Sequence, residues 1–165
     1  MELPDGTRVN LDRIHLEEDA GKSIHEGDST DSSIDLNRAG VPLIEIVTKP
    51  CIRSAEAAGA FLTEVRKTVR FLEVCDGNME EGSLRADANV SIRRKGETRL
   101  GKKVEIKNMN SIRNVRAAIE SEFRRQVELT EAGAEIISET RLFDVATGRT
   151  IAMRQKEELN DYRYF

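Results

Sequence analysis

Residues 81–93, which read EGSLRADANVSIR, place polar and small or apolar side chains in strict alternation. The odd positions carry two acids, two arginines, one amide and two hydroxyls. A period of two predicts a strand with one apolar face and one polar face. Carboxylates and guanidinium groups bind metal ions and phosphate oxygens, so this polar face is the first candidate for chemistry.

Two more segments place charged side chains in the same alternating way, and all three are read as strands of one sheet. The three polar rows are Arg13-His15-Glu17, the odd positions from Glu81 to Arg93, and Lys103-Glu105-Lys107. If the rows lie on one uncovered face, acids and bases from distant parts of the chain meet there.

Convergence of Glu17, Glu81 and Glu105 would require a compensating charge. Two carboxylates about 4 Å apart repel by about 4 kcal/mol at an effective dielectric constant near 20. A protonated carboxyl, a neighbouring Arg or Lys, or a bound divalent cation would each offset this repulsion. Oxygen ligands suit Mg²⁺ or Mn²⁺, and His15 could add a nitrogen ligand.

Three cations on the same predicted surface, Arg85, Arg93 and Lys107, could hold phosphate oxygens. Phosphoryl transfer from a metal–nucleotide complex uses this combination of acids and bases. The chain has no G-x-x-x-x-G-K-[ST] string, so a phosphate-loop fold is not predicted. A solvated face whose charges pair across strands is an equally physical interpretation, and the residues alone leave both open.

The elements that must hold these side chains alternate strands with two long helices. Ser54 and Ser111 are typical N-caps for apolar stripes that run to about residues 75 and 132, the second with Ile112, Val115, Ile119, Phe123 and Val127 facing inward. The predicted strands are a hairpin over 1–10 and segments 11–19, 33–37, 43–48, 81–93, 104–108, 135–143 and 150–154. This order predicts an α+β fold, a largely antiparallel sheet with both helices on one face.

Composition limits the function classes. Charged residues make up 34%, aromatic residues 4%, and the net charge is −4, so there is no global signal for nucleic-acid binding. The segment RRKGETRLGKK is a charged hairpin tip, either a solvated loop or a local nucleic-acid contact. No apolar run approaches the roughly 18 residues of a membrane span. Cys51 and Cys75 lack metal-ligand spacing and favour a reducing compartment.

Five strings carry a resemblance to a known family. They are RIHLEEDAGK (13–22), NRAGVPLIEIV (37–47), DGNMEEGSLRADANVSIR (76–93), VEIKNMNS (104–111) and DYRYF (161–165). In order and spacing they closely resemble the B subunits of the aspartyl/glutamyl-tRNA amidotransferases. The resemblance implies a cradle-shaped α+β domain similar to glutamine synthetase. Residues 1–165 would be a single-domain fragment of it, without an N-terminal section and without the C-terminal helical and tail domains.

The resemblance also implies a reaction. ATP and Mg²⁺ would activate the side-chain carboxylate of Glu-tRNA(Gln) or Asp-tRNA(Asn) by phosphorylation, and ammonia would then displace the phosphate. The implied partners are the amidase or A subunit, which supplies ammonia from glutamine, the small C subunit and the misacylated tRNA. A cytoplasmic heterotrimer without membrane contact is expected. The alternative is a non-catalytic module that binds tRNA or helps to assemble the complex.

Roles for individual residues follow from the same resemblance. Glu17, Glu81 and Glu105 are the expected metal ligands, with His15 and Glu18 as nearby candidates. Strand parity alone decides between Glu17 and Glu18. The remaining expected roles are phosphate neutralisation by Arg85 and Lys107 and substrate orientation by Asp87 or Asn89.

This chain departs from the family pattern in three respects. Ala86 stands where cysteine is frequent, and Cys51 stands where aspartate is common. The sections that the resemblance implies to be missing include a metal-binding Gly-Leu-Glu-Val-His string. An incomplete metal shell should bind Mg²⁺ poorly, so the isolated fragment is expected to be inactive.

Overall fold

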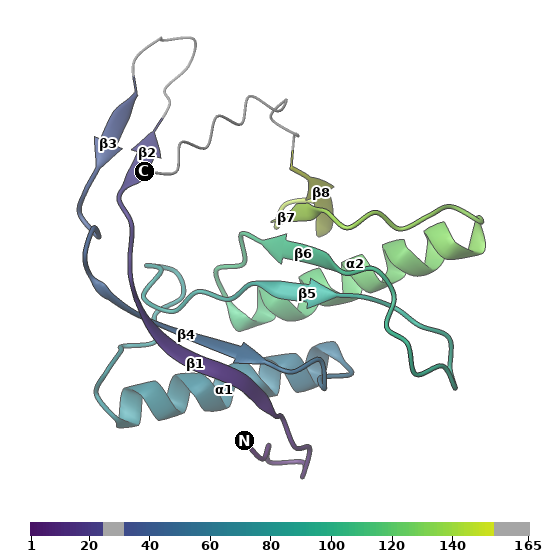
Figure 1. Ribbon diagram of the computed structural model, residues 1–165, viewed down its shortest axis with the longest axis horizontal. Helices are drawn as coiled ribbons and strands as arrows, with labels where there is room; N and C mark the ends of the chain where they lie inside the picture. The colour runs from purple at the N-terminus through teal and green to yellow at the C-terminus, as the bar shows by residue number, and fades with distance from the viewer. Residues whose placement is uncertain (25–31, 154–165) are drawn as a thin grey trace. The chain divides into compact units, whose positions relative to one another are not determined.

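A computed structural model of the chain describes residues 1–24 and 32–153. Within these residues the chain forms eight strands and two helices (Figure 1). The chain divides into two compact units, Met1–Ile52 and Arg53–Phe165, called here the first and second unit. No helix among the described residues has both the length and the apolar character needed to cross a membrane.

The first unit contains two antiparallel strand pairs. Strand β1 (Leu11–Glu18) pairs with β4 (Pro42–Thr48), and β2 (Lys22–Ile24) pairs with β3 (Ser33–Asp35). The predicted hairpin at the start is confirmed by a bridge between Glu2 and Arg8. The interval 21–33, predicted to be a loop, includes β2 and the start of β3, while residues 25–31 lie outside the described residues.

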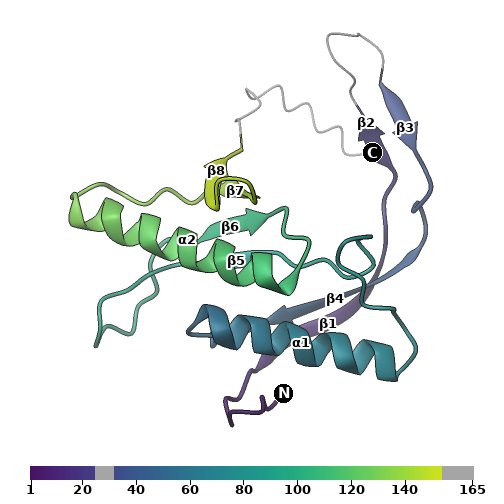
Figure 2. The ribbon, with the colours of Figure 1, turned by 180° about the vertical axis from the view of Figure 1, so that it is seen from behind.

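The second unit contains a four-stranded sheet in the order β5-β6-β7-β8. These strands are Ala88–Val90, Val104–Lys107, Thr140–Asp144 and Arg149–Ala152. Only β6 and β7 pair in parallel. Helix α2 (Ile112–Glu131) lies along one face of this sheet, and helix α1 (Ala55–Phe71) packs on α2 (Figure 2).

The α+β class is confirmed, but the prediction of one sheet beneath both helices is wrong. The described residues form three sheets, and hydrogen-bonded ladders join no strand of the first unit to the second unit's sheet. Strand alternation identifies which segments are extended, whereas the partner of each strand depends on distant residues.

Both helices begin where the sequence predicts. The hydroxyl of Ser54 accepts a hydrogen bond from the Ala57 amide at 3.0 Å, and that of Ser111 accepts one from the Asn114 amide at 3.1 Å. Gly59 allows α1 and α2 to approach closely, because a Cβ there would lie 2.6 Å from Cδ of Arg116. Helix α1 ends at Phe71, before the predicted residue 75, and Glu73 then takes a left-handed φ of 56°.

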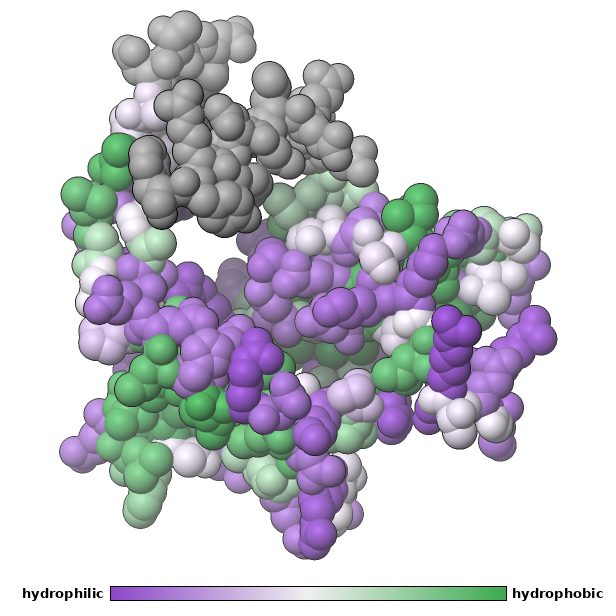
Figure 3. Space-filling view, in the orientation of Figure 1, coloured by the Kyte–Doolittle hydropathy of each residue, from purple (hydrophilic) through white to green (hydrophobic). Residues whose placement is uncertain are grey.

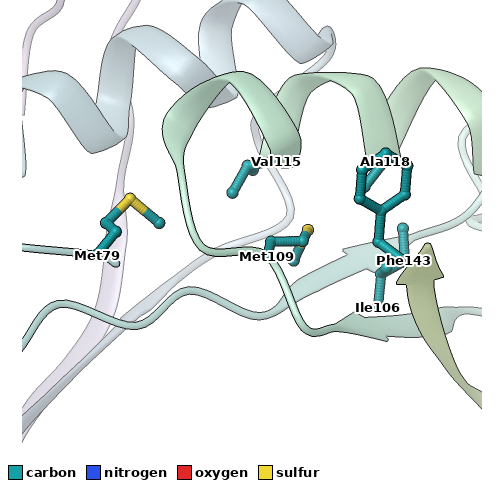
Figure 4. Packing of buried hydrophobic residues seen from close by; sticks show 6 residues of the cluster. All are labelled: Met79, Ile106, Met109, Val115, Ala118 and Phe143. Carbon is teal, nitrogen blue, oxygen red and sulfur yellow. The ribbon is translucent and has the colours of Figure 1, made fainter. Parts of the chain in front are cut away.

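The core of the second unit is one apolar cluster between α2 and the sheet (Figure 4). Its buried members are Met79, Ile106, Met109, Val115, Ala118 and Phe143. Burying a side chain as large as Ile or Phe contributes roughly 1.5–3 kcal/mol. The cluster joins α2 to β6 and β7, so it fixes the strands that carry the polar residues on the opposite sheet face.

The predicted strand over 81–93 is wrong for most of its length, because only Ala88–Val90 forms a ladder. The preceding residues turn: the Leu84 amide donates to the Asn78 carbonyl at 3.1 Å, and Gly82 takes a φ of 76°. The Asn78 side chain also accepts a hydrogen bond from the Glu80 amide at 3.0 Å. These local bonds compete with a ladder.

The alternation of exposure along this segment is nevertheless confirmed. Every odd position from 81 to 89 is exposed, and the even positions between them are less exposed. Leu84, Ala86, Ala88 and Val90 pack against the core cluster. The two-residue period of the sequence therefore predicted correctly which side chains are exposed, even where the backbone does not pair with another strand.

The inward face of α2 differs from prediction in its second half. Phe123, predicted to point inward, is 53% exposed, whereas Glu122 and Gln126 are fully buried. The Glu122 carboxylate accepts hydrogen bonds from Arg125, Gln126 and Thr150, which makes its burial tolerable. The last hairpin is also shorter than predicted, since β7 begins at Thr140, and Arg154 lies outside the described residues.

Candidate functional site

A metal-binding geometry occurs on one face of the β1–β4 ladder. Antiparallel pairing places His15 opposite Glu45, and Glu17 lies two residues along the same face. Nε2 of His15 lies 3.3 Å from Oε2 of Glu45 and also contacts the Glu17 carboxylate. One ligand atom from each residue lies within 4.8 Å of the others, and we call this trio the β1–β4 cluster.

The donor set of this cluster fits a divalent cation. Two carboxylates with one imidazole suit Mn²⁺, and Mg²⁺ also accepts carboxylates when water completes its shell. The three side chains are 38–44% exposed, which leaves room for water ligands. Arg13 lies 3.4 Å from the Glu45 carboxylate and offsets part of the negative charge.

Glu45 was not among the residues predicted from the sequence. The sequence does contain a feature that could have identified it, because Glu45 is the only charged side chain within the strand PLIEIVT. Its place beside His15 depends on the ladder register, which the sequence pattern does not specify. The register is regular from Arg13 to Glu18, so Glu17 shares the face of His15 and Glu18 points to the opposite face, across from Pro42.

A second polar cluster lies on the face of the four-stranded sheet that α2 does not cover. Nζ of Lys107 lies 2.8 Å from the Asp87 carboxylate and 3.4 Å from Oε1 of Glu105. The Thr140 hydroxyl donates to Oε2 of Glu105 at 3.0 Å. We call Asp87, Glu105, Lys107 and Thr140 the β5–β6 cluster, and Asn89 is paired with Glu105 in the ladder.

The charge state of Lys107 follows from these contacts. The hydrogen bond to Asp87 raises the pKa of Lys107, partial burial opposes that rise, and Glu105 adds to it. The ammonium is therefore charged throughout the physiological range. The two carboxylates therefore hold the ammonium in one place on this face of the sheet.

The other predicted residues occupy separate places. Glu81 and Arg85 are exposed in the segment that leads into β5. The Arg93 guanidinium donates to the Thr98 carbonyl at 2.8 Å in the loop after β5. Glu17 belongs to the first unit whereas Glu81 and Glu105 belong to the second, and the convergence of these three carboxylates stays a prediction.

Comparison with known proteins identifies the family. A family model described as the GatB/GatE catalytic domain matches residues 2–165, so the chain belongs to the GatB/GatE catalytic domain family. The resemblance to the amidotransferase B subunits noted from the sequence is thereby confirmed.

Curated relatives give the same result. The B subunit of the aspartyl/glutamyl-tRNA(Asn/Gln) amidotransferase of Paramagnetospirillum magneticum is 58% identical over 167 aligned positions, which cover 100% of this chain and 34% of the relative. The proteins of the same name from Rhodospirillum rubrum and Gluconobacter oxydans are each 56% identical with the same coverage. The chain spans about one third of the length of these relatives.

Proposed function

We propose that this chain is the part of a tRNA-dependent amidotransferase that activates a carboxylate for amidation. The substrate would be the side chain of Glu on tRNA(Gln) or of Asp on tRNA(Asn). The cofactors would be ATP and Mg²⁺, and an amidase subunit would supply ammonia within a complex that also contains a small third subunit. Membership of the family supports the reaction class, and the β1–β4 cluster is the observation that carries the metal-dependent step.

The proposed chemistry has two steps. A carboxylate oxygen of the substrate attacks the γ-phosphorus of ATP, the bond from that phosphorus to the β–γ bridging oxygen breaks, and ADP leaves. Ammonia then attacks the acyl carbon, the bond from this carbon to the phosphate oxygen breaks, and the nitrogen loses a proton. Phosphate is a far better leaving group than hydroxide, which is why prior phosphorylation enables the second step.

The residues would divide this work by charge. His15, Glu17 and Glu45 would hold the divalent cation. Glu81 and Glu105 of the second unit are the further carboxylates predicted from the sequence, whereas Glu18 points to the opposite face of the β1–β4 ladder and would not take part. When bound, the cation would neutralise and orient the triphosphate oxygens.

The cationic residues would serve the substrates. Lys107, held between Asp87 and Glu105, would neutralise the transferred phosphoryl group together with Arg85. Arg93 would contact ATP phosphate oxygens, and Asp87 or Asn89 would orient the aminoacyl end of the tRNA.

The test uses the full-length protein in its complex with Glu45→Gln. Replacing one ligand carboxylate should lower ATP-dependent amidation by about a hundredfold and raise the Mg²⁺ concentration needed for half-maximal rate. Asp12→Asn is the matched control, since Asp12 is exposed on the same strand and contacts only Arg13 among the ion pairs described. A Glu45→Gln complex with wild-type rate and wild-type Mg²⁺ dependence would contradict the proposal.

A further inference from the structure

Positive charge is concentrated in the loop between β5 and β6. Residues 93–103 contain six basic residues and one acid, a net charge of +5 in a chain whose net charge is −4, so the remaining residues carry −9. The 13 residues from 91 to 103 separate the two paired strands, far more than a tight hairpin needs. Loops of about this length are uncommon inside a compact unit, and the ordered ones often have a functional role.

Contacts within the loop give it a defined shape. The Arg93 guanidinium donates to the Thr98 carbonyl at 2.8 Å, and the Glu97 amide donates to the Arg94 carbonyl at 3.1 Å. Gly101 lies against the other side of the loop, because a Cβ there would come within 2.4 Å of the Ile92 carbonyl oxygen. At the tip, Gly96 takes a φ of 93° that other residues rarely adopt.

The loop presents four uncompensated cations to solvent. Lys102 pairs with Glu135, and Arg93 is used within the loop. The other four basic residues are exposed and have no ion pair with any residue that the structure describes; they are Arg94, Lys95, Arg99 and Lys103. Figure 1 shows the loop extending past the ends of β5 and β6, and Figure 3 shows hydrophilic side chains over this end of the second unit.

We propose that this loop binds the phosphate backbone of the tRNA at a distance from the reacting aminoacyl end. The inference rests on the proposed function for the identity of the polyanion. A phosphate backbone needs only exposed cations, whereas protein interfaces use aromatic and apolar anchors. The loop has no aromatic residue, and Leu100 is its one exposed large apolar side chain.

The position of the loop defines its role. It leaves β5 after Val90 and enters β6 at Val104, at the opposite strand ends from Asp87 and Lys107. At about 3.3 Å per residue, Val104 lies about 10 Å along β6 from Lys107. Beyond Arg93, which the proposed function places at ATP, the loop therefore contributes to tRNA binding and takes no part in the chemical steps.

The experiment measures binding of a tRNA transcript to the full complex carrying Arg94→Gln and Lys95→Gln. We expect the dissociation constant to rise about tenfold near 0.15 M salt. The plot of log affinity against log salt concentration should become shallower by nearly 2, about one unit for each lost phosphate contact. In amidation, KM for misacylated tRNA should rise by the same factor while kcat stays unchanged.

The matched control carries Arg53→Gln and Arg113→Gln, which removes the same charge at exposed sites outside the loop and should leave binding within about twofold. An unchanged affinity and salt slope in the loop variant would overturn the inference. So would intact tRNA binding with lost assembly of the complex, which would assign the loop to a protein partner. Failure of the proposed function would give a different result from failure of this inference, since the wild-type complex would then bind tRNA but show no ATP-dependent amidation.

Discussion

At the scale of single residues, the β5–β6 cluster depends on a carboxylate whose two oxygens are both engaged. Oε1 of Glu105 lies beside Lys107 and Oε2 accepts the Thr140 hydroxyl. A side chain held at both oxygens keeps one orientation, which is what a metal ligand or substrate-positioning group requires. Thr140 is therefore expected to position Glu105.

Thr140→Val in the full complex should lower ATP-dependent amidation by about tenfold, since Glu105 loses its donor while the shape of the side chain is kept. Thr140→Ser retains the hydroxyl and should restore most of the rate. The measurement is the rate as a function of Mg²⁺ concentration. Equal rates for the Val and Ser variants would show that the hydroxyl does not position Glu105.

At the scale of elements, α2 is held at its start by a local cap and along its length by a buried charge network. Ser111→Ala should cost about 1 kcal/mol of unfolding free energy, because the Asn114 amide loses its acceptor. Ser111→Asp should retain most of the stability, since aspartate is an equally good cap. Urea denaturation measures the unfolding free energy of both variants. An unfolding free energy of Ser111→Ala equal to that of the wild type would mean that the cap contributes nothing to stability.

The buried network joins α2 to the last hairpin through Glu122. Burial alone would raise the pKa of Glu122, but hydrogen bonds from Arg125, Gln126 and Thr150 outweigh it and hold the pKa below its ordinary value. Arg141 of β7 also lies 3.6 Å from this carboxylate. The charged form is therefore the one that the folded state stabilises.

Glu122→Gln should destabilise the chain by about 3 kcal/mol near pH 7, since Arg125 and Arg141 lose a buried partner. A lowered pKa gives stability that is present above the unfolded-state pKa of about 4.3 and is lost as pH falls through the folded-state value. Unfolding measured from pH 7 to pH 3 should therefore bring wild type and variant closer together. Glu128→Gln, on the exposed side of α2, is the control and should follow wild type at each pH.

At the scale of the whole molecule, stability of the second unit depends on the apolar cluster that joins α2 to the sheet. Phe143 is 2% exposed in this cluster, whereas Phe123 is 53% exposed on α2. Phe143→Ala should cost about 3–5 kcal/mol, and Phe123→Ala should cost less than about 1 kcal/mol. Urea denaturation measures the loss of unfolding free energy in each variant. Similar losses for the two variants would contradict the finding that Phe123 lies on the exposed side of α2.

Local patterns determined much of this protein. The helix starts at Ser54 and Ser111, the alternation of exposure from 81 to 89 and the family resemblance were all readable from the sequence. Caps, helical stripes and strand periods arise between residues a few positions apart, so short segments contain the information that specifies them.

The tertiary structure decided what depends on distant partners. The antiparallel register places Glu45 beside His15, 30 residues earlier in the chain. Glu122 is buried in place of Phe123 because Arg141 of the last hairpin compensates its charge and Thr150 donates a hydrogen bond to it. The turn around Gly82 likewise replaces most of the strand predicted over 81–93, although the side chains keep the predicted alternation of exposure. Register and the burial of charge depend on groups that meet only after folding, and a periodic pattern along the chain does not encode which groups those are.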